Sequence, residues 1–304
     1  MKKALCTVLF LFCVTALVFT LDLELLGGIG NLAYDRERTS ALSDENVKGS
    51  FSPHYYPLLL ARVSGEYAGL GFDAGFERNP LIRNIIFANL KIEREYFSFE
   101  AGPFISIFNT RKLWLNPGLS AGLGVAVPGK VFGKVRGSST LGVPMDTTDH
   151  FSLITGDISL GFWVPYVICS LNMNFRSYTT REQANLLVED GLTRYFFRAD
   201  VHTKNMPYTI RLDLGYQNLS RSYASQKVSG SDIVKNTGKD EFKSIFLGLE
   251  GTFTLNQSLK LVLGGEMPVY SWGVRPMKDP SKGTMLFQAR AGVILTFGGE
   301  SADS

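Results

Sequence analysis

Most of this chain alternates between apolar and polar residues, and this alternation restricts the fold more than any other feature. Around residue 170, for example, Cys169, Leu171 and Met173 interleave with Ser170 and Asn172. Successive side chains of a β-strand point to opposite faces, so such a stretch has one apolar and one polar face. The repeated pattern predicts an all-β fold.

The alternating stretches number about fourteen, each of roughly ten residues, close to the length with which a tilted strand crosses a bilayer. No second apolar run after the N-terminus is long enough for a spanning helix. We therefore predict a transmembrane, antiparallel, up-and-down β-barrel of about fourteen strands, with twelve or ten as the alternatives. The predicted strands are 21–34, 55–64, 66–78, 83–93, 96–108, 116–127, 131–142, 151–164, 167–177, 195–204, 208–218, 242–255, 259–269 and 285–297.

The predicted connections alternate in length. Those after even-numbered strands are tight, such as Ser64-Gly65 and Pro165-Tyr166, whereas several after odd-numbered strands are long and polar. Outer-membrane barrels combine short periplasmic turns with longer outer loops, and an even strand number then leaves both termini on the periplasmic side. The long polar connections are 35–53, 178–194, 219–241 and 270–283, with a short helix considered within 180–189.

The N-terminus has the pattern of a secretory signal peptide, residues 1–20. Lys2 and Lys3 precede an uncharged run from Ala4 to Phe19, as in a signal sequence. An uncleaved membrane helix and lipidation at Cys13 are the weaker alternatives. We expect a barrel over 21–297 and a short periplasmic tail over 298–304.

The last predicted strand carries Arg290, Gly292, Leu295 and Phe297 in the order polar, any, Gly, two any, hydrophobic, any, aromatic. This order resembles the C-terminal insertion signal of Gram-negative outer-membrane β-barrels, and the chain is similar to porin-like members in strand and loop pattern. The resemblance implies an integral protein of the outer membrane, in contact with its lipid and recognised by the barrel-assembly machinery. It departs from the family at the end, because Gly298 to Ser304 follow the aromatic residue that usually terminates the chain.

The polar face of the predicted strands is rich in charged residues. A dry core could not hold so many charges, so we expect the apolar face to meet lipid and the polar face to line a water-filled lumen. Acidic and basic residues nearly balance there, and loss of the leader would leave 29 basic against 28 acidic side chains overall, which argues against nucleic-acid binding. The residues expected to line the pore are Arg62, Asp73, Lys91, Glu100, Asp157, Arg198, Asp200, Arg211, Asp213, Glu250, Glu266 and Arg290.

The sequence offers little for catalysis, metals or cofactors. His54, His150 and His202 have no second His or Cys at metal-ligand spacing, so no metal site is expected. Gly118–Gly122 matches a nucleophile-elbow pattern but lies inside an alternating strand rather than at a strand-to-helix turn. We expect neither an enzyme nor a bound cofactor.

The sequence is compatible with three functions. The first is a channel that lets small polar solutes pass passively through a charged lumen. The second is a substrate-selective transporter, with a hydrophobic ligand among Phe87, Phe104, Phe132, Phe196 and Phe246. The third is a structural or adhesive surface barrel whose long loops make the contacts. The solute and the oligomeric state are not predicted.

Overall fold

The computed structural model describes residues 20–31, 55–109, 113–141, 150–182, 186–202, 206–229, 232–272 and 286–298. Within these ranges the chain forms fourteen β-strands, and no helix there is long and apolar enough to cross a membrane. The strands are β1 (Thr20–Gly30), β2 (Tyr56–Tyr67), β3 (Leu70–Asn79), β4 (Arg83–Glu93), β5 (Phe97–Asn109), β6 (Leu113–Val127), β7 (Val131–Thr140), β8 (His150–Val164), β9 (Val167–Glu182), β10 (Leu186–His202), β11 (Tyr208–Ser229), β12 (Asp232–Asn256), β13 (Leu259–Trp272) and β14 (Gln288–Phe297).

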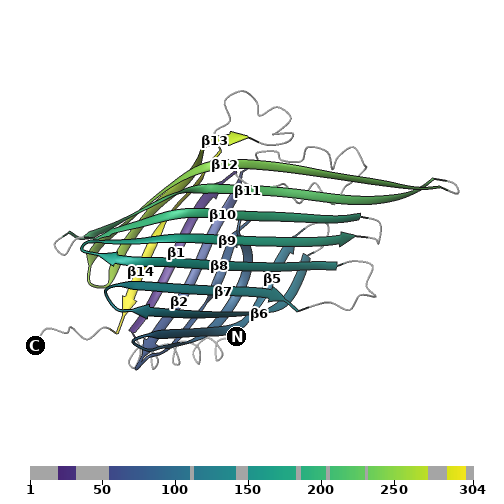
Figure 1. Ribbon diagram of the computed structural model, residues 1–304. Helices are drawn as coiled ribbons and strands as arrows, with labels where there is room; N and C mark the ends of the chain where they lie inside the picture. The colour runs from purple at the N-terminus through teal and green to yellow at the C-terminus, as the bar shows by residue number, and fades with distance from the viewer. Residues whose placement is uncertain are drawn as a thin grey trace, which may run out of the picture.

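Each strand pairs antiparallel with its sequence neighbours, and the ring closes where β1 pairs with β14 (Figure 1). The closing register runs from Leu21 opposite Phe297 to Gly30 opposite Gln288. Closure removes the free sheet edges, whose unpaired N–H and C=O groups would be costly in a lipid environment. The predicted fold class, an all-β antiparallel barrel of fourteen strands, is confirmed.

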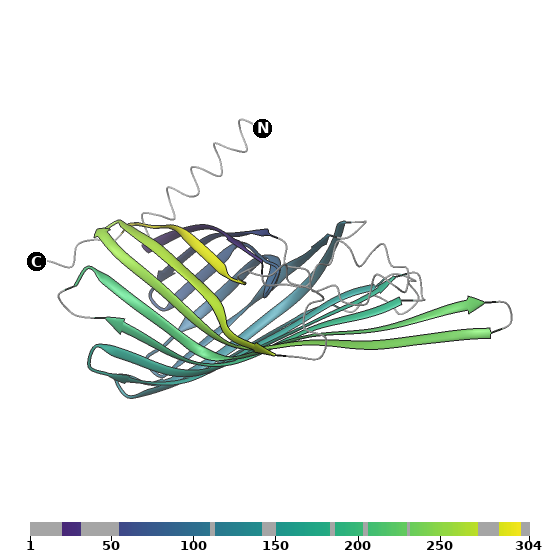
Figure 2. The same ribbon diagram turned by 90° about the horizontal axis from the view of Figure 1, so that it is seen from above.

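The two rims of the barrel differ. The connections β2–β3, β4–β5, β6–β7, β8–β9, β10–β11 and β12–β13 lie at one end, which we call the tight-turn rim; β1 begins and β14 ends there. At the other end, the hairpin rim, β11 and β12 reach 22 and 25 residues and project far beyond their neighbours (Figure 2).

Two predicted long connections are in fact strand. Residues 178–194 belong mostly to β9 and β10, and 219–241 belong mostly to β11 and β12, so no helix forms in the described part of 180–189. These stretches resemble loops in the sequence because they are rich in polar residues and lack a regular alternation. The predicted connection 35–53 and most of 270–283 lie outside the described residues, as do residues 1–19 of the predicted leader and 299–304 of the tail.

The first tight turn is also displaced from its predicted position. Ser64 and Gly65 lie within β2, and the chain reverses at Ala68 and Gly69, whose φ angles are +51° and +77°. A two-residue hairpin turn of type I′ needs positive φ at both positions. Glycine adopts positive φ readily, whereas alanine rarely does, so nothing in the residue type of Ala68 indicates a turn at this position.

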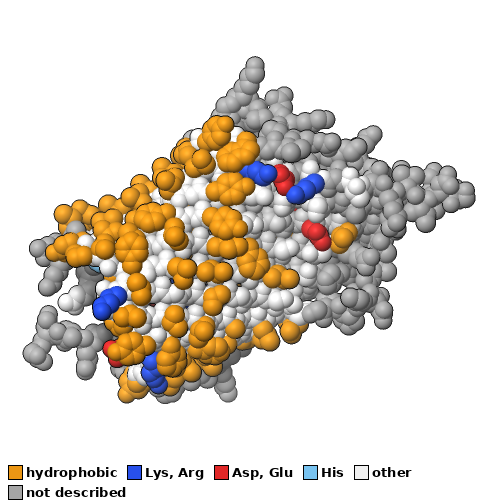
Figure 3. Space-filling view, viewed as in Figure 1, with side chains coloured by type: hydrophobic (Ala, Val, Ile, Leu, Met, Phe, Trp, Pro, Cys, Tyr) orange, Lys and Arg blue, Asp and Glu red, His pale blue; other side chains and the backbone are white. Residues whose placement is uncertain are grey.

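The outside of the barrel is apolar. Large hydrophobic side chains there are among the most exposed of the described residues, for example Leu90 at 73%, Leu171 at 66% and Leu160 at 61%. Figure 3 shows such side chains spread over the barrel wall, with the few charged groups on this face at either side of the apolar region. Soluble monomers rarely expose so large a continuous apolar surface. Transmembrane barrels do, because their outer apolar band contacts the lipid hydrocarbon.

Candidate pore lining

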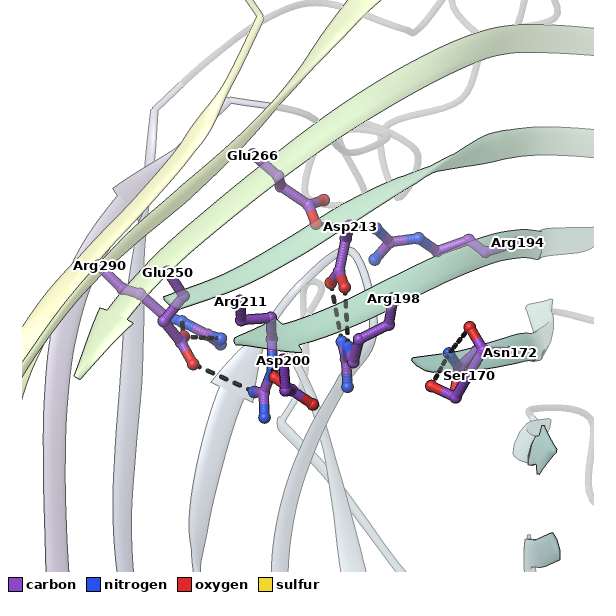
Figure 4. A network of polar contacts seen from close by, with 10 residues as sticks. All are labelled: Ser170, Asn172, Arg194, Arg198, Asp200, Arg211, Asp213, Glu250, Glu266 and Arg290. Atoms are coloured by element: carbon purple, nitrogen blue, oxygen red, sulfur yellow. Dashed lines mark hydrogen bonds and ion pairs between the residues drawn. The ribbon is translucent and has the colours of Figure 1, made fainter. Parts of the chain in front are cut away.

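A network of arginines and carboxylates covers the inner wall formed by β10 to β14 (Figure 4). Arg198 donates two hydrogen bonds to Asp213, of 2.7 and 2.8 Å. Arg211 donates to Asp200 at 2.7 Å and to Glu250 at 3.1 Å. Such forked contacts are the strong form of the arginine–carboxylate interaction, and here they join three successive strands.

Arg290 of β14 extends this network by donating to Glu250. Glu250 therefore lies between two guanidinium groups, those of Arg211 and Arg290. Its carboxylate holds together strands that do not pair with one another.

A second ion pair connects two strands that lie further apart in the barrel wall. Arg194 of β10 donates from Nη2 to Glu266 Oε2 at 2.8 Å, although β10 and β13 are separated by two other strands. The guanidinium also lies 4.1 Å from the centroid of Phe246 and 5.5 Å from that of Phe196. Contact with ring faces compensates in part for its burial, since only 5% of Arg194 is exposed.

Smaller groups of charges line the remaining wall. Arg62 makes a two-pronged contact with Asp73, at 2.7 and 3.0 Å. Lys91 pairs with Glu93 at 2.5 Å. Glu100 lies 3.3 Å from Arg136 and 3.6 Å from Lys134, and Asp157 accepts a hydrogen bond from the amide of Asn174 at 2.7 Å.

The twelve residues expected to line the pore thus fall into several groups rather than one ring. Arg198, Asp200, Arg211, Asp213, Glu250 and Arg290 form the main network. Glu266 forms a separate pair with Arg194, and Arg62 with Asp73, Lys91, Glu100 and Asp157 lie on other parts of the wall. Sequence reasoning missed Arg194 and also the buried pair in which Arg221 of β11 donates to Asp190 of β10 at 2.5 and 2.8 Å, because all three residues fell in stretches taken for loops. The alternation from Arg198 back through Phe196 would have placed Arg194 on the same face.

The main network borders a cavity of about 190 Å³ inside the barrel. Arg194, Arg198, Arg211 and Arg290 line it on one side, and residues of β1 to β3 line it on the other. This volume is below the ~300–1,000 Å³ of sites for drug-sized ligands. The cavity therefore suits water, ions and small solutes.

The five phenylalanines considered for a hydrophobic ligand are used mainly as packing. Phe87, Phe104, Phe196 and Phe246 are 0–7% exposed, and Phe132 packs against Trp163 with ring centroids 4.8 Å apart. Their rings pack against neighbouring side chains and do not form an open pocket for a ligand. Phe196 alone among them borders the cavity.

The described histidines take no part in the polar contacts given above. His150 and His202 lie at the ends of β8 and β10, and His54 is outside the described residues. Across the described ranges, no group of three or more His, Cys, Asp or Glu side chains is arranged to hold a metal ion.

Comparisons with known proteins found similarity in structure only. No protein-family model matches the sequence, and no curated protein shows significant sequence similarity to it. Among solved structures, it is similar to a bacterial polysaccharide outer-membrane secretin, with 9% identity over 92% of this chain and 98% of that one and a TM-score of 0.47. It is also similar to OmpT of Vibrio cholerae, with 9% identity, coverage of 92% and 98%, and a TM-score of 0.41. A porin gives 12% identity, coverage of 92% and 99%, and a TM-score of 0.26. With all three scores below 0.5, the architecture described above rests on this chain's own strand pairing.

Proposed function

We propose that this protein is an integral outer-membrane channel that lets small polar solutes pass passively through its charged lumen. The observation that carries the proposal is that paired charges inside the barrel are still open to water. The side chains of Arg62, Arg211 and Arg290 are 42%, 37% and 46% exposed while each is held by a carboxylate. If these ion pairs only stabilised a closed, dry core, their side chains would be buried.

The arrangement of charges suits a weakly selective passage. Arginines and carboxylates alternate along the wall and nearly cancel in charge, so the lumen offers neither a cationic nor an anionic barrier. Opposed charges instead produce a local field across the passage, which favours polar over apolar solutes. The channel is therefore proposed to sort by size and polarity more than by charge.

The orientation belongs to the same proposal. We place the tight-turn rim, with both chain termini, in the periplasm and the hairpin rim outside the cell, as in barrels of this kind. The strand bearing Arg290, Gly292, Leu295 and Phe297 then enters the membrane as the closing strand and serves as the signal for the barrel-assembly machinery. The protein is proposed to need no cofactor and to catalyse no reaction.

Reconstitution into planar lipid bilayers tests the proposal. The protein, refolded in detergent and added at low concentration, is expected to give discrete conductance steps in KCl. Matched detergent and a heat-unfolded sample provide the controls. Absence of steps from correctly folded protein, across a range of salt concentrations and voltages, would rule out a passive channel.

A surface-binding role is the second candidate, and the projecting β11–β12 hairpin favours it. Its strands continue to Ser229 and from Asp232, beyond the last pairing of β10 at Leu186. Removal of residues 226–235 would abolish binding to a cell-surface partner while leaving conductance unchanged. Loss of conductance instead would assign the hairpin to the channel.

A further inference from the structure

The short connection between β3 and β4 folds into the barrel. β3 ends at Asn79 and β4 begins at Arg83, and between them Leu81 is fully buried in a cluster with Leu192, Leu219 and Phe242. These three residues belong to β10, β11 and β12. β4 and β11 are seven strands apart in either direction round the ring, so the turn crosses the lumen and contacts the opposite wall.

Polar contacts hold the turn in this position. Arg176 of β9, which is only 4% exposed, donates from Nη1 to the carbonyl oxygens of Pro80, at 3.1 Å, and Leu81. The side chain of Asn79 accepts hydrogen bonds from the backbone N–H groups of Leu81 and Ile82. Pro80 has no N–H of its own to satisfy. A buried turn normally carries unpaired backbone groups, and here the cross-lumen arginine and the asparagine supply partners.

The turn separates the cavity from the hairpin rim. Asn79 and Ile82 line the cavity next to the arginine network, while Ile82 and Leu286 pack against the apolar cluster around Leu81. A polar solute that enters from the hairpin rim would thus meet the apolar barrier first and the charged groups after it. Hydrophobic constrictions of this kind hinder ions because water does not readily wet them.

We propose that the β3–β4 turn is the constriction of the channel and that Leu81 determines the largest solute that can pass. The inference rests on the proposed channel function and identifies the part of the lumen that limits it. Arg176 acts as a positioning residue, since it holds the turn across the lumen from the opposite wall.

The test compares Leu81→Ser and Arg176→Met with the wild type and with Val262→Ser as a matched control. Val262 is 3% exposed on β13 and lies outside the cluster of Leu81, so its replacement removes buried methyl groups without releasing the turn. Unit conductance is measured in planar bilayers, and liposome swelling in neutral sugars of increasing size gives the exclusion limit. Far-UV circular dichroism and the mobility of unheated samples in SDS gels establish that each variant is a closed barrel.

Leu81→Ser and Arg176→Met are expected to give several-fold larger conductance steps and to admit larger sugars, whereas Val262→Ser behaves as the wild type. The inference is overturned if folded Leu81→Ser and Arg176→Met conduct and exclude sugars as the wild type does, or if Val262→Ser opens the channel equally. If neither the wild type nor the two turn variants conduct at all, the proposed channel function itself fails.

Discussion

Arg198 and Asp213 lie directly opposite each other on β10 and β11 and share two hydrogen bonds, of 2.7 and 2.8 Å. At the next luminal position of the same strands the order of charge is reversed, with Asp200 opposite Arg211. Opposite charges therefore face each other both along and across this pair of strands, which is the favourable arrangement for cross-strand pairs.

The Arg198–Asp213 pair is expected to stabilise the barrel. Its side chains are 29% and 14% exposed, so removing one leaves the other charge poorly compensated. A double-mutant cycle of Arg198→Ala and Asp213→Ala should give a coupling free energy of about 0.5–3 kcal/mol, measured by urea unfolding in lipid vesicles. The control is the pair Lys239–Glu241, whose lysine side chain is 62% exposed and whose glutamate is 15% exposed. It should show weaker coupling; equal coupling in both pairs would argue against the burial effect.

Glu250 is expected to control ion selectivity. Glu250→Gln removes the charge shared by Arg211 and Arg290 and leaves the network with excess positive charge. The reversal potential in a KCl gradient should move from near zero toward anion preference. Glu95→Gln changes the net charge equally, but at an exposed site between β4 and β5, and should leave the potential unchanged. A shift as large for this control would mean that the lumen does not determine selectivity.

Adjacent residues on β8 test the two faces of the wall. Leu160 is 61% exposed on the outside of the barrel. Ser159 directly precedes it in the sequence, and its side chain therefore points to the luminal side. Leu160→Arg places a charge against lipid and should cost up to about 2–4 kcal/mol of unfolding free energy, depending on depth in the bilayer. Ser159→Arg should cost far less, because its charge can reach water. Urea unfolding in vesicles measures both, and a larger loss for Ser159→Arg would reverse the assigned faces.

Gly292 is expected to be essential where the barrel closes. A Cβ atom there would lie 1.9 Å from the carbonyl oxygen of Leu25, so Gly292→Ala should destabilise the β1–β14 pairing by about 1–3 kcal/mol. Gly27, on the same pair of strands, has open space around its Cβ position, and Gly27→Ala is the matched control.

Folding in detergent and folding in cells distinguish two roles of Gly292, close packing and recognition by the assembly machinery. Refolding into detergent uses no assembly machinery, so a defect of Gly292→Ala there would reflect packing. A defect seen only in cells would reflect recognition of the terminal strand. Normal folding in both settings would leave Gly292 with neither role.

The alternation of side chains was sufficient to predict the architecture. Fourteen strands, antiparallel order and closure followed from stretches such as Val167–Phe175, because a period of two leaves one face for lipid and the other for the lumen. Strand ends were harder to predict. Toward the far ends of β11 and β12 apolar and polar residues no longer alternate in the sequence, so the pattern that marks a strand disappears although the hydrogen-bonded pairing continues.

The contacts across the lumen could not be predicted from the sequence. Leu81 and Phe242 are distant in the chain, and nothing in Asn79–Arg83 distinguishes an inward turn from an ordinary one exposed to solvent. The partners of each arginine were equally hidden, because alternation assigns a side chain to a face but not to a neighbour. Arg194, for instance, contacts Glu266 on a strand that β10 does not pair with.

Cysteine accessibility along β9 tests the central claim most directly, that lipid contacts the outer face of the wall and water the inner face. Single cysteines replace Leu171, Asn172, Met173 and Asn174 in a Cys169→Ala background, and a charged, membrane-impermeant thiol reagent is added to the protein in vesicles. An alternating result is expected, in which the cysteines at 172 and 174 react and those at 171 and 173 do not. Uniform labelling, or labelling at 171 and 173 instead, would contradict it.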